Sequence, residues 1–105
     1  MPTTANLEKL PELLQLLDRL ELEARGWSIV DEWEVDLAAV GVSSAKHPDR
    51  IFYISVFGQP PGRLYHTRDL RTDDNHLHTL SDGHITVLEL LPLMTRFLDA
   101  DELWS

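Results

Sequence analysis

The residues with the clearest chemical potential in this sequence are histidines. His76 and His78 are separated by one residue, and His66 and His84 lie nearby in the chain. Two imidazoles at alternate positions of a strand project from one face, and imidazole nitrogens are common ligands for zinc and related divalent ions. With a carboxylate from the preceding loop, His76 and His78 would form a metal site in a small metal-binding domain or metal-dependent enzyme. The competing interpretation is that these histidines are solvated residues of a hairpin.

The sequence contains no motif for other kinds of catalytic chemistry. The chain contains no cysteine, which excludes disulfides, zinc–thiolate sites, iron–sulfur clusters and a thiol nucleophile. Ser43 and Ser44 do not lie in a G-x-S-x-G elbow. The phosphate-binding motifs G-x-x-x-x-G-K-[ST] and G-x-G-x-x-G are also absent from the sequence. The sequence therefore predicts a protein that is not an enzyme and that needs no cofactor.

A row of carboxylates provides a second candidate site. Glu32, Glu34 and Asp36 alternate along a predicted strand, so they should project from one face about 7 Å apart. This spacing is similar to that of successive phosphates along a nucleic-acid strand, which small acidic inhibitors imitate when they occupy the basic active site of a nuclease. We interpret the row as partner-binding, with Tyr65 and Trp104 as aromatic anchors. The alternative is an ordinary solvated face.

Net charge narrows the class of partner. The 105 residues include 18 acidic and 9 basic side chains, for a formal charge of −9. Such a chain repels phosphate backbones and anionic lipid, so we expect a basic protein partner, no direct nucleic-acid binding and no membrane binding. No apolar run approaches the roughly 20 residues of a membrane span, and the sequence begins without a secretion signal, which predicts a cytoplasmic protein.

Size, acidity, lack of cysteine and lack of a catalytic motif together are similar to the profile of small bacterial inhibitors. Immunity proteins that neutralise a toxin and phage-encoded blockers of host defence share this profile. The similarity implies an inhibitor of a basic protein such as a nuclease. It is a likeness of profile and maps no residue of this chain onto a family motif.

The N-terminal third is predicted to form a helix and a long strand. Leucines recur at helical spacing after Pro11, which suits a first helical turn, and Gly26 is placed to end the helix. Residues Trp27–Leu37 then alternate between apolar and acidic side chains, which is typical of a half-buried strand. Asp31 breaks this alternation, so it should lie near the strand end or find a donor. Residues Gly41–Arg50 resemble a connection because they are rich in serine and contain a His-Pro-Asp turn.

The middle of the chain is predicted to be two hairpins. Ile51–Phe57 is continuously apolar, as a central strand covered on both faces requires, and Arg63–Leu70 alternates weakly after a glycine- and proline-rich turn. Ser81-Asp82-Gly83 has the composition of a second tight turn between two short arms. Polar residues 71–75 separate these two units.

A C-terminal helix completes the predicted fold. Thr86 and Glu89 have the spacing of a capping box, and Pro92 either kinks this helix or begins its regular part. We therefore expect residues 1–105 to form a single α+β domain of two layers, with an N-terminal helix, a central and mostly antiparallel sheet of 3–5 strands, and a C-terminal helix. Leucine-rich terminal helices also allow a homodimer, as in a self-associating structural subunit.

Overall fold

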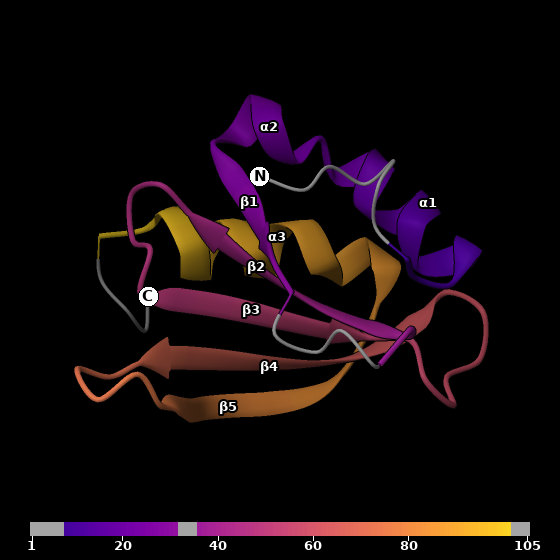
Figure 1. Ribbon diagram of the computed structural model, residues 1–105. Helices are drawn as coiled ribbons and strands as arrows, with labels where there is room; N and C mark the ends of the chain where they lie inside the picture. The colour runs from indigo at the N-terminus through magenta and orange to yellow at the C-terminus, as the bar shows by residue number, and fades with distance from the viewer. Residues whose placement is uncertain (1–7, 32–35, 102–105) are drawn as a thin grey trace.

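The chain has the α+β architecture that its sequence predicts. The computed structural model describes residues 8–31 and 36–101, with an N-terminal helical segment, an antiparallel sheet and a C-terminal helix (Figure 1). Along the chain the elements are α1 (Pro11–Leu20), α2 (Leu22–Arg25), β1 (Trp27–Val30), β2 (Ala39–Ser44), β3 (Arg50–Ser55), β4 (Arg63–Arg71), β5 (Leu77–Thr86) and α3 (Val87–Asp99). Within the described ranges, none of the helices has the length and apolar character to cross a membrane.

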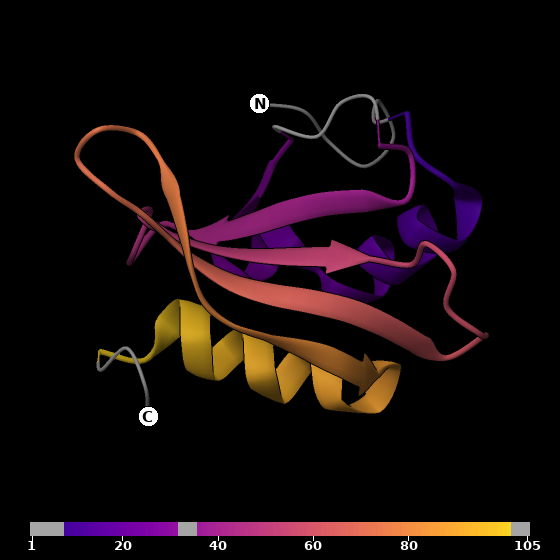
Figure 2. The same ribbon diagram turned by 90° about the horizontal axis from the view of Figure 1, so that it is seen from below.

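The sheet is a meander in which every strand pairs with the next one along the chain. Its order is β1-β2-β3-β4-β5, and all four pairings are antiparallel. Short connections make this arrangement simple, because an antiparallel neighbour needs only a turn. The sheet twists strongly, and the β4–β5 hairpin extends beyond the other strands (Figure 2).

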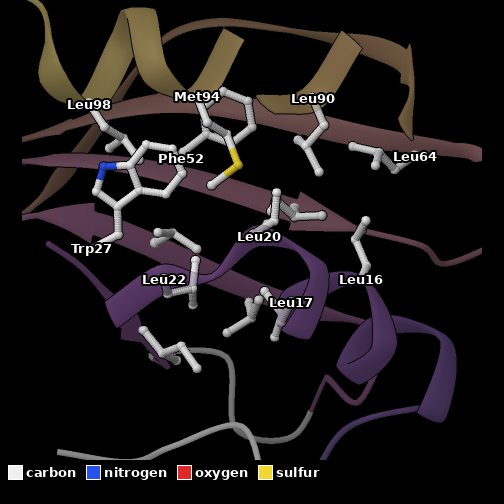
Figure 3. Packing of buried hydrophobic residues seen from close by; sticks show 14 of the residues in the cluster. Leu16, Leu17, Leu20, Leu22, Trp27, Phe52, Leu64, Leu90, Met94 and Leu98 are labelled. Carbon is white, nitrogen blue, oxygen red and sulfur yellow. The ribbon is translucent and has the colours of Figure 1, made fainter. Parts of the chain in front are cut away.

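One hydrophobic core lies between the sheet and all three helices. Alternate residues of each strand point to the helices, and Phe52 and Leu64 near the middle of the sheet are completely buried. Leucines of α1 and α2 meet Leu90 and Met94 of α3 over this face (Figure 3). The leucine periodicity of both terminal segments thus serves a shared core, and the opposite face of the sheet is left without a helical layer among the described elements.

The first helix begins at Pro11, as predicted, but it is not continuous to Gly26. α1 ends at Leu20 because Glu21 adopts a left-handed conformation with φ 51° and ψ 56°, and its amide bonds back to the Asp18 carbonyl at 3.4 Å. The single turn α2 follows and ends at Gly26, which has φ 75° and so confirms the predicted stop. Helical periodicity persists across the break, which is why the sequence does not reveal it.

The prediction of a connection over Gly41–Arg50 is wrong for residues 41–44. β2 covers Ala39–Ser44, and the turn lies between this strand and β3. Val40 and Val42 face the core, while the small residues that alternate with them face the other side. Gly41 is the cross-strand partner of Tyr53.

The predicted strand Trp27–Leu37 is too long: β1 ends at Val30, and Asp31, Asp36 and Leu37 belong to no strand, so Asp36 does not project from a strand as predicted. Residues 32–35 of the predicted strand lie outside the described residues.

The predicted turn at Ser81-Asp82-Gly83 is also wrong. β5 continues through these residues, and Asp82 and Gly83 pair with Thr67 and His66 of β4. The chain reverses instead within the polar loop at 72–76, where Asn75 has φ 66°. A glycine inside a strand is often a place where a large neighbour comes close, and here the nearest atom to an added Cβ would be Cε1 of His66 at 3.7 Å.

The C-terminal helix begins at Val87 and not at Pro92. Thr86 and Glu89 form the predicted capping box, with the side chain of each residue bonded to the backbone of the other. Pro92 lies inside α3 and removes one backbone hydrogen bond, but the helix continues because Leu90 and Met94 anchor it in the core. At its other end Asp99 accepts hydrogen bonds from Trp27 Nε1 at 3.0 Å and Ser44 Oγ at 3.1 Å.

Candidate binding face of the sheet

The sheet face that points away from the helices carries the candidate site. On this outer face, β2 contributes only the small residues Ala39, Gly41 and Ser43, and larger side chains stand on β3, β4 and β5. We define the outer-face cluster as six residues that share this face across three neighbouring strands: Tyr53, Tyr65, Thr67, Asp69, Asp82 and His84.

Two tyrosines form the centre of the outer-face cluster. The rings of Tyr53 and Tyr65 meet edge to face, with 6.5 Å between centroids and an interplanar angle of 75°. The ring of Tyr65 also contacts the ring of His84 on β5, with 5.3 Å between centroids. The hydroxyl of Tyr65 donates a hydrogen bond of 2.8 Å to Oδ2 of Asp82. Both tyrosines are half-buried. Ring contacts on two sides and the hydroxyl hydrogen bond hold Tyr65 in place before any partner arrives.

The electrostatic environment of the tyrosines is negative. Burial raises the pKa of Tyr53 above its usual value, a hydrogen bond with Ser55 opposes the rise, and the charges of Asp36 and Asp69 add to it. The pKa of Tyr65 is raised first by its hydrogen bond to Asp82, and the charges of Asp82 and Asp69 act in the same direction. Two aspartates therefore act on each hydroxyl group, and their negative charges favour the approach of cations to this face.

Asp69 is the buried acid of the outer-face cluster. Its side chain is almost inaccessible, and Oδ1 accepts a hydrogen bond of 2.9 Å from Thr79 of β5. The two residues are cross-strand partners next to a β-bulge, at which Leu80 is an extra residue on β5. A buried carboxylate with this hydrogen bond strengthens the negative potential of the face, because little solvent screens it.

The structure brings together two of the five residues predicted to bind a partner. Tyr65 lies at the centre of the outer-face cluster, and Asp36 lies close enough to Tyr53 for its charge to raise the pKa of that tyrosine. Glu32, Glu34 and Trp104 lie outside the described residues. The carboxylate of Asp36 accepts a hydrogen bond of 3.0 Å from the Ala38 amide, which fixes its position at the start of the turn into β2.

A neighbouring acid, Asp31, is neutralised within the chain. Lys9 has a fully buried side chain and forms an ion pair with Asp31 at 3.0 Å, while its ammonium group also donates to the Asp36 carbonyl at 2.8 Å. Asp31 thus lies just beyond the strand end, as expected, and has Lys9 as its ionic partner, although its Oδ1 accepts no hydrogen bond within the described part of the chain. The ion pair connects the segment before α1 to the end of β1.

The histidines are distributed over three different environments. His66 is buried and stacks on Phe52 with 5.1 Å between centroids, so it is not a solvated hairpin residue. His76 lies in the loop before β5, where Nδ1 is 2.8 Å from Asp74 Oδ2, and His78 is exposed on β5 itself. Among the described residues, no three His, Cys, Asp or Glu side chains are grouped for a metal ion. Metal binding by His76 and His78 stays a prediction, which elemental analysis of purified protein tests.

His66 also has a defined hydrogen-bonding state. Its Nδ1 is 3.0 Å from the Gly83 carbonyl oxygen, which can only accept, so Nδ1 carries the proton. Nε2 is buried and has no hydrogen-bond partner within the described part of the chain. Burial lowers the pKa of His66, and the charge of Arg68 lowers it further. The neutral ring thus belongs to the core, beside the outer-face cluster but on the other side of the sheet.

A cleft beside α1 is a second candidate surface. Its volume is about 390 Å³, and it lies between α1, the β3–β4 turn and the first residue of α3. Glu12 and Arg19 of α1 contribute charges of both signs to its wall. Val56 and Val87 line the cleft, and the next residue after each, Phe57 and Leu88, is strongly exposed, at 78% and 90%. The mixed charges of the cleft favour no particular class of partner.

Sequence reasoning misses several members of the outer-face cluster for an identifiable reason. Because Ser-Asp-Gly is a strong turn composition, it assigns Asp82 and His84 to a turn and its short arm. Asp69 lies in a segment that alternates only weakly. The signal that finds them is pairing: once β5 is a continuous strand, strict alternation places Asp82 and His84 on the face of Tyr65.

Comparison with protein-family models, with curated proteins and with solved structures finds no match to this chain.

Proposed function

We propose that this chain is a protein-binding module that docks a basic protein on the outer face of its sheet and inhibits it. The observation that carries the proposal is the ring contact between two half-buried tyrosines on one face of the sheet, with the hydroxyl of Tyr65 bonded to Asp82 and with Asp69 on the same face. Tyrosine is enriched in binding hot spots because it combines a large contact area with a polar hydroxyl and few rotatable bonds.

Charge supports a basic partner. The formal charge of −9 gives long-range attraction to a cationic surface, and Asp36, Asp69 and Asp82 supply a local negative field around the tyrosines. A lysine or arginine of the partner placed over a tyrosine ring gains a cation–π contact of about 0.5–2 kcal/mol. A nuclease is the type of basic protein that we propose, because its active site already binds a row of negative charges.

Preorganisation supports binding by a rigid surface. Tyr65 is held by contacts with Tyr53, His84 and Asp82, so docking needs little ordering of this side chain. Immobilising a free side chain on binding costs about 0.5–1.5 kcal/mol, and a residue already in place avoids most of that cost. The backbone beneath the cluster belongs to regular strands, so it too needs little ordering on binding.

Affinity capture with matched baits tests the proposal. We expect wild-type protein, incubated with lysate of its source organism, to retain a basic protein that the Tyr65→Ala bait loses and that a Leu88→Ala bait retains. Leu88 is the matched control because it is exposed and lies on α3, away from the cluster. The captured protein, once purified, should lose its own activity when the chain is added. Capture that is unaffected by Tyr65→Ala, or capture without inhibition, would contradict the proposal.

A further inference from the structure

The free edge of β5 is the second surface of interest. β5 is the last strand of the sheet, it is ten residues long, and no described strand pairs with its outer edge. Figure 2 looks onto this edge, with α3 beside it and not across it. Proteins usually protect such an edge with lysine or other charged side chains, proline, a β-bulge or a very short strand. Residues 77–86 contain neither lysine nor proline, and the bulge at Leu80 leaves the six residues Ser81–Thr86 regular.

The regular part of this edge is self-complementary. Ser81–Thr86 follows the bulge without further irregularity. Consider two copies that pair antiparallel through β5 about a two-fold axis at Gly83. Asp82 then lies opposite His84 of the second copy, and His84 lies opposite the second copy's Asp82. Centring the pair on Asp82 instead would place two carboxylates opposite each other, which is unfavourable.

The geometry of both side chains suits this pairing. Asp82 and His84 share the outer face, and both are exposed on the strand. Asp82 uses Oδ2 for the hydroxyl of Tyr65, and a carboxylate accepts several hydrogen bonds, so it can accept an N–H of the second copy's imidazole as well. Gly83 on the axis presents no side chain that would have to pack against its own copy.

The exposed side chain of Leu80 gains a neighbour in the same arrangement. The Gly83-centred register places Leu80 opposite Thr86 of the second copy, where α3 begins. Leu80 is 42% exposed and is one of four exposed large apolar side chains among the described residues. In this register the methyl group of the second copy's Thr86 would cover part of it.

We infer that two copies of this chain associate through antiparallel pairing of their β5 edges, centred on Gly83, to form one continuous sheet. Asp82 and His84 belong to the outer-face cluster as well, but the inference does not rest on the proposed function, because association of the purified chain with itself is measured without any basic protein partner. Its consequence is that the two outer-face clusters would lie side by side on the same surface.

Charge variants test the register. We expect sedimentation velocity over a broad concentration series to show a monomer–dimer equilibrium for the wild-type protein. His84→Glu places a second carboxylate opposite the other copy's Asp82 and should raise the dissociation constant about tenfold, because two like-charge pairs replace two favourable ones. The double variant Asp82→His with His84→Asp exchanges the partners and should restore the dimer. A wild-type monomer at every concentration, or a dimer unaffected by His84→Glu, would overturn the inference.

Cross-linking provides a test that does not depend on charge. The chain has no cysteine, so Gly83→Cys introduces a single thiol at the proposed axis, where an added Cβ makes only an ordinary contact with His66. Mild oxidation should give a covalent dimer. Thr79→Cys is the control, since the same register separates the two copies of residue 79 by about 27 Å. An absence of Gly83→Cys cross-links from protein that circular dichroism shows to be folded would also overturn the inference.

Discussion

Tyr65 on β4 donates its hydroxyl hydrogen bond to Asp82 on β5 at 2.8 Å while its ring stands edge to face with Tyr53 on β3. A single side chain therefore connects three neighbouring strands on the face opposite the helices. This relationship joins the aromatic and acidic parts of the outer-face cluster, since the carboxylate that orients the tyrosine is also one of the charges expected to attract a basic partner. The predictions below begin with this pair.

The first prediction concerns the ionisation of Tyr65. Its hydrogen bond to Asp82 favours the protonated hydroxyl and raises its pKa above 10.0. Because the folded-state value is the higher one, this contribution to stability is present below pH 10 and is lost as pH rises through the folded-state pKa. We expect Asp82→Asn to move the titration of Tyr65 to lower pH. Ultraviolet absorbance in a Tyr53→Phe background assigns the titration, and an unchanged midpoint would contradict the assigned hydrogen bond.

The second prediction concerns folding stability in mild acid. Burial lowers the pKa of His66 below its usual value of 6.5, so the unfolded chain binds more protons than the folded chain in the range just below pH 6.5. His66 should therefore contribute to a loss of stability as pH falls through this window, and stability should recover as pH rises. Urea unfolding at several pH values should show a flatter dependence for His66→Gln than for the wild type.

Exposed His78 provides the control for that experiment. Its side chain is on β5 outside the core, so His78→Gln should retain the pH dependence of the wild-type protein. Equal slopes for His66→Gln and wild type would mean that His66 is not held neutral in the core. Since Arg68, Asp82 and His84 are the charged or titratable groups that also act on His66, a variant of each distinguishes their contributions.

The third prediction concerns the break between α1 and α2. Glu21 has a left-handed backbone conformation, which costs a non-glycine residue about 1–2 kcal/mol. Glu21→Gly should therefore stabilise the fold by up to about 1 kcal/mol after the entropy cost of glycine in the unfolded chain is subtracted. Glu23→Gly, placed inside α2, should destabilise it by a similar amount. Chemical denaturation measures both, and a destabilising Glu21→Gly would contradict the assigned conformation.

The fourth prediction concerns the hydrogen bonds that hold the C-terminal end of α3 against the sheet. Asp99 accepts hydrogen bonds from Trp27 and Ser44, which join α3 to β1 and β2. Asp99→Ala should lower the free energy of unfolding by about 1–3 kcal/mol, because two partly buried donors lose a charged acceptor. Asp101→Ala is the matched control, as the exposed residue Asp101 lies just beyond the helix. Equal stability of the Asp99→Ala and Asp101→Ala variants would show that these hydrogen bonds contribute nothing.

The sequence predicts the layers of this fold better than its turns. Leucine periodicity and the capping box at Thr86 identify both helical ends, because burial of one face leaves a strong pattern. Turn-like composition is a weaker indicator, because Asp82 and Gly83 are compatible with a turn and equally with the strand that they form beside His66. Only the pairing with β4 decides between them. Most of the outer-face cluster is therefore hidden from sequence reasoning, as its members are far apart along the chain.

The central claim is that the outer face binds a basic protein through preorganised tyrosines and an acidic field. The most direct measurement is the association rate of the captured basic protein with wild-type chain and with Asp82→Asn as salt concentration increases. Our account predicts a rate that falls steeply with salt for the wild type, and a slower and less salt-dependent rate for Asp82→Asn. Rates that are independent of salt, or identical for the two proteins, would contradict it.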